Sequence, residues 1–121
     1  MRHLEENTQI DCVTWFRLQY PKLFPFLHHS PNGGKRNARE GARFKAMGTK
    51  AGFPDIAIYI PASGYHGLFI EMKTSKGRQT DTQKEWQELL SQQGYKYEVC
   101  RGFDEFRHIV NKYLNQYPLY R

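Results

Sequence analysis

Two short apolar runs with acidic residues at their ends constrain this chain more than any other feature. Residues 56–60 and 68–70 are separated by a turn region containing Pro, Ala, Ser and Gly, a pattern that predicts two paired β-strands. Asp55 enters the first run, while Glu71 and Lys73 leave the second and share one strand face. A hairpin would place both carboxylates and the lysine together. Such a cluster is suited to holding a divalent metal ion for phosphate chemistry.

Composition indicates one folded domain covering residues 1–121, with 39% hydrophobic and 15% aromatic residues. No apolar run approaches the ~20 residues that span a bilayer, and the amino terminus lacks the apolar segment of a secretory signal. We therefore expect an intracellular, cytoplasmic protein with no membrane partner. Cys12 and Cys100 are too few for a disulfide framework or a zinc cluster, so we expect both to be reduced core residues.

The periodicity predicts an α/β fold with the element order α-β-α-β-β-α-β-α. Helices are expected over residues 5–20, 37–47, 80–93 and 104–117, and strands over 23–27, 56–60, 68–70 and 95–100. Two capping boxes are possible at the third helix, Thr80 with Gln83 or Thr82 with Glu85. Gln83 faces the expected sheet, so it either caps this helix or reaches the acidic cluster.

The first expected helix carries a carboxylate on its inward stripe. Val13, Phe16 and Tyr20 follow steps of three and four, and the same stripe includes Glu6 and Gln9. An inward carboxylate requires a cation or a metal as partner. An exposed first helical turn, where the helix dipole favours Glu6, fits the sequence equally well.

Basic residues cluster in the loops and in the second expected helix, within a net charge of +6. This surplus suits a polyanion such as DNA, although charged solvent-exposed faces are just as common. The candidate DNA-binding residues are Lys35, Arg36, Arg39, Arg43, Lys45, Lys50, Lys76 and Arg78. His28 and His29 precede the first of them in a predicted turn-rich loop, where a metal-ligand role is only weakly indicated.

The acidic cluster has the groups that phosphodiester hydrolysis needs. Asp55 and Glu71 would hold Mg2+ or Mn2+, with the backbone carbonyl of Met72 as a further oxygen ligand. Lys73 would orient or activate the attacking water, and Glu6 could complete the metal shell. The alternative for Glu71 and Lys73 is a surface ion pair of little energetic value. No organic cofactor is expected.

These residues resemble the VRR-NUC family, the virus-type replication-repair nucleases of the PD-(D/E)xK superfamily. The likeness rests on E-x-x-Q from Glu6, G-x-P-D ending at Asp55, G-L-F-I-E-M-K ending at Lys73, and T-x-x-Q-x-x-W from Thr80. It implies a restriction-endonuclease-like core, a small mixed sheet flanked by helices, and Mg2+- or Mn2+-dependent cleavage of DNA. It also implies that Glu6, Asp55 and Glu71 are metal ligands, that Lys73 is catalytic and that Gln83 assists.

Small stand-alone members of this family resemble homodimers that act on branched DNA, such as four-way junctions. The resemblance therefore predicts a structure-specific endonuclease acting on branched or duplex DNA as a homodimer. Three alternatives remain open: an inactive DNA-binding module with a nuclease fold, a flap nuclease, and a sequence-specific restriction-like nuclease.

Overall fold

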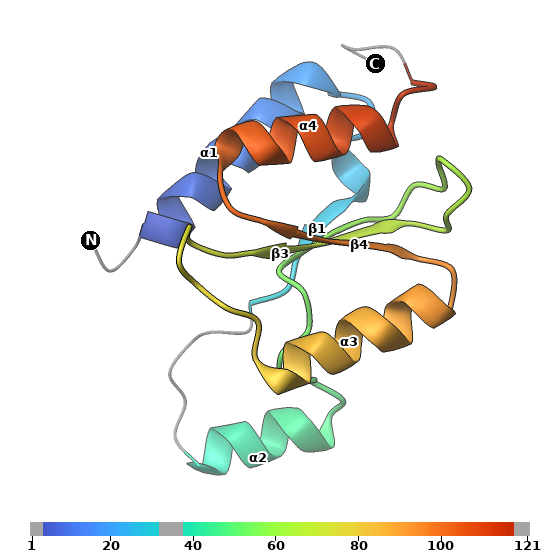
Figure 1. The fold of residues 1–121 in the computed structure, drawn as a ribbon. Coiled ribbons are helices and arrows are strands. Elements are labelled where there is room, and N and C mark those ends of the chain that lie inside the picture. The colour runs from blue at the N-terminus through green and yellow to red at the C-terminus, as the bar shows by residue number, and fades with distance from the viewer. Residues whose placement is uncertain (1–3, 32–37, 118–121) are drawn as a thin grey trace.

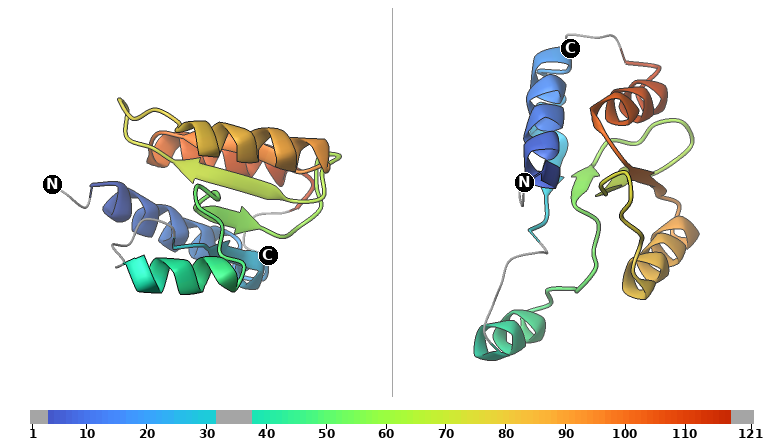
Figure 2. Two further views of the ribbon diagram at one scale, coloured as in Figure 1. Left: turned by 90° about the horizontal axis from the view of Figure 1, so that it is seen from below. Right: turned by 60° about the vertical axis from the view of Figure 1, so that its left-hand side comes forward.

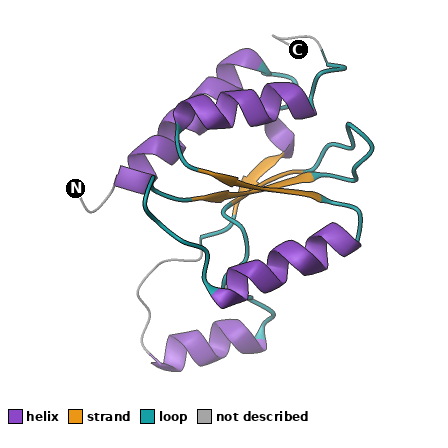
Figure 3. Cartoon of the chain, viewed as in Figure 1, coloured by secondary structure: helices purple, strands orange, loops and turns teal. Residues whose placement is uncertain are grey.

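The chain forms a four-stranded mixed sheet with helices on both faces, as the computed structural model shows for residues 4–31 and 38–117 (Figures 1 and 3). The sheet order is β1-β2-β3-β4, with antiparallel β1–β2 and β2–β3 pairs and a parallel β3–β4 pair. The elements are α1 (Leu4–Gln19), a 3-10 helix η1 (Phe24–Phe26), β1 (Leu27–His29), α2 (Ala38–Ala46), β2 (Ile56–Ile58), β3 (Leu68–Met72), α3 (Asp81–Gln92), β4 (Lys96–Cys100) and α4 (Phe103–Tyr113). The predicted element order and the mixed sheet are confirmed.

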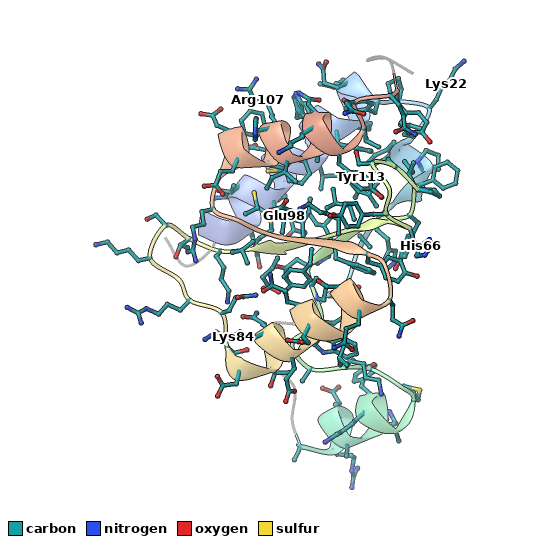
Figure 4. All side chains as sticks on the ribbon, turned by 45° about the vertical axis from the view of Figure 1, so that its right-hand side comes forward. Lys22, His66, Lys84, Glu98, Arg107 and Tyr113 are labelled. Atoms are coloured by element: carbon teal, nitrogen blue, oxygen red, sulfur yellow. The ribbon has the colours of Figure 1, made fainter. Side chains whose placement is uncertain are left out.

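The main hydrophobic core fills the space between one face of the sheet and the helices α1 and α4, which lie side by side (Figures 1 and 2). The alternate residues Ile56, Ile58 and Ile70 are fully buried on this face, as period-2 alternation requires. Tyr113 points from α4 towards the sheet (Figure 4), and its hydroxyl donates a 2.7 Å hydrogen bond to the carbonyl of Ile60. Cys12 and Cys100 are buried free thiols, which confirms their predicted state.

The opposite face of the sheet carries a smaller aromatic cluster under α3. Ala57, Phe69 and Tyr97 are buried there, and Phe53 and Tyr95 pack against them. The ring centroids of Phe53 and Phe69 lie 5.5 Å apart in an edge-to-face arrangement. Asp55 and Glu71 have the strand parity of this second face, so the predicted acidic residues lie on the α3 side of the sheet.

The strand predicted at residues 23–27 is wrong in its position. Residues 24–26 form η1 instead, because Pro25 is compatible with the first turn of a helix and cannot donate to a β-ladder. The strand begins at Leu27, which pairs with Ile58, and it continues through His29, which pairs with Ile56. The two histidines therefore belong to an edge strand rather than to a loop.

Several predicted boundaries also differ from the structure. The strand predicted over 56–60 ends at Ile58, while the strand predicted over 68–70 continues to Met72 because β4 pairs with it along its whole length. The last helix ends at Tyr113 rather than at residue 117, and Leu114 follows it as a buried residue. These boundaries depend on pairing and packing between distant parts of the chain, which the local sequence pattern does not reveal.

A hydrogen-bonded cap and a loop contact fix the position of α3. Thr80 and Gln83 form the capping box, so the alternative box at Thr82 is not used. Farther along α3, the indole of Trp86 donates a 3.0 Å hydrogen bond to the carbonyl of Ala51, in the connection between α2 and β2. Gly52 in that connection has a φ of +74°, and a Cβ there would lie 2.7 Å from Thr82 Cγ2.

The residues that the structure describes include no helix that is long and apolar enough to cross a lipid bilayer.

The capping box predicts a stability difference between two neighbouring threonines. Thr80→Ala removes the hydroxyl that accepts from the Gln83 amide and should lower the free energy of unfolding by about 1 kcal/mol. Thr82→Ala, in the same helical turn, should change it by less than about 0.5 kcal/mol. Urea denaturation followed by circular dichroism measures both. An equal or larger loss in Thr82→Ala would contradict the assignment of the cap.

Candidate active site

Asp55 and Glu71 are brought together by the pairing of β2 with β3. Ile56 pairs with Ile70, so the residue before the first and the residue after the second lie next to each other at one end of the strand pair. The backbone amide of Met72 donates a 2.7 Å hydrogen bond to Asp55 Oδ2, which fixes this carboxylate beside Glu71. The predicted convergence of the two acids is therefore present.

Glu71 is only 3% exposed, and two side chains donate hydrogen bonds to its carboxylate. Gln83 Nε2 lies 2.7 Å from Oε2, and the Tyr97 hydroxyl lies 3.2 Å from Oε1. Burial raises the pKa of the Glu71 carboxyl to about 8, and the Asp55 carboxylate contributes to that rise. Lys73 and the Tyr97 hydroxyl lower this pKa but do not reverse the shift. A surface ion pair, the alternative for Glu71, is excluded by this burial.

Lys73 lies immediately after β3 with its backbone held in place. Its amide donates a 2.9 Å hydrogen bond to the carbonyl of Cys100, so the parallel ladder continues one residue beyond Met72. The following loop is held by Arg101, whose guanidinium donates hydrogen bonds of 2.8 Å to Thr74 O and 2.5 Å to Gly77 O. The lysine is half-buried and acts electrostatically on Glu71, which places its charge at the acidic pair.

Gln83 has two functions that the sequence left as alternatives. Its side-chain oxygen accepts a 2.8 Å hydrogen bond from the Thr80 amide, which completes the cap of α3. Its side-chain nitrogen donates to Glu71 at 2.7 Å. Because one amide group supplies an acceptor and two donors, both contacts are made together. The helix start and the acidic residue are thereby fixed relative to each other.

A second contact chain joins α1 to the backbone of Asp55. His29 Nδ1 lies 2.9 Å from Gln9 Nε2 and 2.9 Å from the carbonyl of Asp55. Glu6 lies one helical turn before Gln9 and is exposed. Within residues 4–31 and 38–117, no group of three His, Cys, Asp or Glu side chains is placed so that it could hold a metal. Glu6 is thus not brought into one group with Asp55 and Glu71.

The oxygen atoms of the acidic pair fit a hard divalent cation. Mg2+ and Mn2+ favour carboxylate and carbonyl oxygens, and Mg2+ retains several waters, so two carboxylates from the protein are sufficient. Burial of Glu71 raises the pKa of its carboxyl first and the adjacent Asp55 carboxylate raises it further, and a bound cation would offset both effects. Asp55, Glu71 and the carbonyl of Met72 are the groups that would hold such an ion.

The structure describes six of the eight candidate DNA-binding residues, and all six are exposed. Four of them lie on α2 or just after it, and the other two lie in the loop between β3 and α3. They are, in this order, Arg39, Arg43, Lys45, Lys50, Lys76 and Arg78. Lys35 and Arg36 lie outside the described residues.

Sequence reasoning missed Tyr97 and His29 as parts of the site. Tyr97 lies within the strand predicted over 95–100, but its approach to Glu71 depends on the β3–β4 register, in which Phe69 pairs with Tyr97. Burial raises the pKa of the Tyr97 phenol, so it remains a hydrogen-bond donor. His29 reaches Asp55 because β1 extends through it. The tyrosine's strand parity was a usable signal, whereas the adjacent pair of histidines indicated only a weak metal-ligand role and not a contact with the Asp55 backbone.

Comparisons with known proteins agree with this arrangement. A family model described as the VRR-NUC domain matches residues 5–104. A solved structure described as a VRR_NUC domain protein is 37% identical, with a TM-score of 0.81, and the match covers 92% of this chain and 88% of that one. No curated protein matches the chain. The matched range includes the acidic pair, Lys73, Gln83 and Tyr97.

The raised pKa of Glu71 predicts a pH-dependent stability in the metal-free protein. The folded-state pKa of about 8 exceeds the ordinary value of 4.5, so protonated Glu71 stabilises the fold fully below about 4.5. This contribution is lost as the pH rises through 8. Glu71→Gln resembles the protonated form, and at pH 8.5 it should be more stable than wild type by about 2–4 kcal/mol.

Urea unfolding in EDTA between pH 4.5 and 8.5 measures this difference, which should shrink as the pH falls. Glu88→Gln, at an exposed position of α3, is the matched control and should show no such trend. Parallel stability curves for wild type and Glu71→Gln would contradict the assignment.

Proposed function

Because the chain belongs to the VRR-NUC domain family, which implies a nuclease, we propose that it is a Mg2+- or Mn2+-dependent DNA endonuclease. The observation that carries the proposal is the pair formed by the buried Glu71 and the half-buried Asp55, with Lys73 beside it. Two carboxylates forced together on a sheet face cost stability unless a cation offsets their charge. That cost is explained if the pair binds a metal for phosphate chemistry.

Each side chain has a role that follows from its position. Asp55 and Glu71 bind the ion, together with the Met72 carbonyl. Gln83 and Tyr97 hold the Glu71 carboxylate in one orientation through hydrogen bonds of 2.7 and 3.2 Å. Lys73 directs a positive charge to the place where negative charge develops on the phosphate, and it orients or activates the attacking water. The bound ion would supply Lewis acidity and a water of lowered pKa.

Glu6 and Gln9 have an outer role in this proposal. His29 Nδ1, when protonated, donates to the carbonyl of Asp55 and supports the orientation of the first metal ligand, and Gln9 lies beside the same ring nitrogen and donates to it only in the other tautomer. Glu6, one turn earlier on α1, would complete the metal shell through a bridging water or hold a second ion.

Branched DNA is the substrate that we propose, with the protein acting as a homodimer. The exposed cations of α2 and of the loop after β3 would contact phosphates on either side of the acidic pair. A two-fold dimer would present two active sites to a two-fold substrate such as a four-way junction. An inactive DNA-binding module would need these cations but not the acidic pair.

Plasmid nicking tests the hydrolase. Wild type with Mg2+ or Mn2+ should nick supercoiled DNA, and Lys73→Ala should lower the rate by about 10²–10⁴-fold. Asp55→Ala should abolish it. Lys84→Ala, an exposed lysine on α3 (Figure 4), is the matched control and should retain wild-type rates. Undiminished nicking in both Asp55→Ala and Lys73→Ala would defeat the proposal.

Calorimetry with Mn2+ separates the nuclease from an inactive binding module. Wild type should bind the ion, while Asp55→Asn and Glu71→Gln should each bind it at least about 10-fold more weakly. DNA binding with no carboxylate-dependent Mn2+ site would favour the binding module.

The substrate preference and the assembly can be tested together. Four-way junctions should be cleaved faster than forks, flaps and linear duplex, and light scattering should give twice the 14.3 kDa chain mass. Faster cleavage of flaps, fixed-site cleavage of linear duplex, or a monomeric mass would each replace that part of the proposal.

A further inference from the structure

A cavity close to the backbone of Asp55 has no part in the metal-binding and catalytic roles assigned above. Its volume is about 440 Å3, and its lining includes His28, Phe44, Lys50 and Phe53. Cavities that bind small molecules span about 300–1,000 Å3 and are mostly apolar with a few polar groups. The volume and composition of this cavity both fall within that description.

The cavity lies next to the backbone of Asp55. Ser30 forms part of its wall, and the amide of Ser30 donates a 2.8 Å hydrogen bond to the carbonyl of Asp55. Phe53, on another wall, precedes Asp55 by two residues. If DNA binds at the acidic pair, a group of the same DNA could therefore reach the cavity from close by.

One aromatic wall of the cavity is rigid. The ring of Phe53 packs edge-to-face against Phe69 and Trp86, with centroid distances of 5.5 and 5.1 Å. Trp86 is itself held to the Ala51 carbonyl, in the same connection that carries Phe53. This wall is thus fixed by the aromatic cluster under α3 and requires no rearrangement to receive a ligand.

The other aromatic wall is held by the end of α2. The amide of Thr49 bonds to the carbonyl of Phe44, and the amide of Gly48 bonds to that of Lys45, each at 3.0 Å. This pair of bonds is a Schellman motif, with Gly48 at a φ of +108° as the left-handed residue. Phe44 is half-buried and lines the cavity from the end of α2.

One cation lines the cavity, and a second lies near the Phe44 wall. Lys50 is exposed and lines the cavity, and the guanidinium of Arg43 lies 6.0 Å from the centroid of the Phe44 ring. Aromatic walls with cations at the rim match the two parts of a nucleotide, a base that stacks and a phosphate that carries charge. A purely apolar partner would have no use for these cations.

We propose that this cavity holds one unpaired base of the DNA substrate, stacked against Phe44 beside the acidic pair. Lys50 pairs with the phosphate of the same nucleotide. A base in a continuous duplex is stacked between its neighbours and cannot enter the cavity without leaving the helix. The cavity would therefore favour DNA with unpaired nucleotides next to the cleaved bond. This inference rests on the proposed function for its substrate, and it adds the contact that selects the substrate.

A fork DNA carrying 2-aminopurine at its first unpaired nucleotides tests the cavity. The Lys73→Ala protein, used to prevent cleavage, should quench the fluorophore on binding. Adding Phe44→Ala should remove the quenching and raise the fork dissociation constant about 5- to 150-fold, which corresponds to the loss of one stacked base. Binding of a fully paired duplex of the same sequence should change less than 2-fold. Phe44→Trp, which keeps an aromatic face, should retain the quenching.

Two controls separate stacking from loss of structure. Phe26→Ala removes a 48% exposed ring from η1 and should leave fork binding unchanged. Phe44→Leu keeps an apolar side chain for the packing of α2, and it should still lose the quenching. Equal weakening of fork and duplex binding by Phe44→Ala, or no weakening, would overturn the inference. The inference would also be overturned if Phe44→Ala changed the oligomeric state but not DNA binding, because the cavity would then accept a second copy of the chain.

The failure of this inference can be distinguished from the failure of the proposed function. If the wild-type protein nicks DNA but its fork binding does not depend on Phe44, the proposed nuclease function stands and the base-binding cavity is refuted. If quenching depends on Phe44 but no metal-dependent nicking occurs, the base-binding cavity stands and the protein binds DNA without hydrolysing it.

Discussion

The burial of the Glu71 carboxylate is the constraint on which the rest of the structure depends. Within residues 4–31 and 38–117, Glu71 is the one buried residue with a charged side chain, and it is 3% exposed. A buried carboxylate requires hydrogen-bond donors, because removing an ionised group from water costs several kcal/mol or more. Gln83 supplies one donor through the cap of α3, and Tyr97 supplies another through the β3–β4 register. The cap of α3 and the β3–β4 register thus both hold the Glu71 carboxylate in place.

The sequence predicted most of the fold because its signals are local. Alternation marked β2 and β3, threonine and glutamine marked the start of α3, and the helical stripe ending at Tyr20 marked the core face of α1. The strand β1 was misplaced because its residues pair only through contacts with β2, 27 or more residues away along the chain. A three-residue edge strand carries too little local pattern to identify it.

The candidate site was predictable to the extent that it lies on strands. Asp55, Glu71 and Lys73 follow from strand parity once the hairpin is assumed, and Gln83 follows from its helix face. Tyr97 and His29 need the register of β4 and the extension of β1, which are tertiary results. The position of Glu6 outside a three-ligand group likewise depends on how α1 crosses the sheet.

The two faces of the sheet divide stability from chemistry. The face under α1 and α4 holds the larger apolar core, whose burial supplies the main driving force for folding. The stability gained from this core allows the other face to carry an acidic pair that is unfavourable when it is ionised and no metal is bound. The smaller aromatic cluster then has a second use, since Phe53 belongs both to its packing and to the wall of the cavity beside Asp55. A cluster that stabilises the face with the acidic pair thereby also shapes the cavity that we propose as a base-binding site.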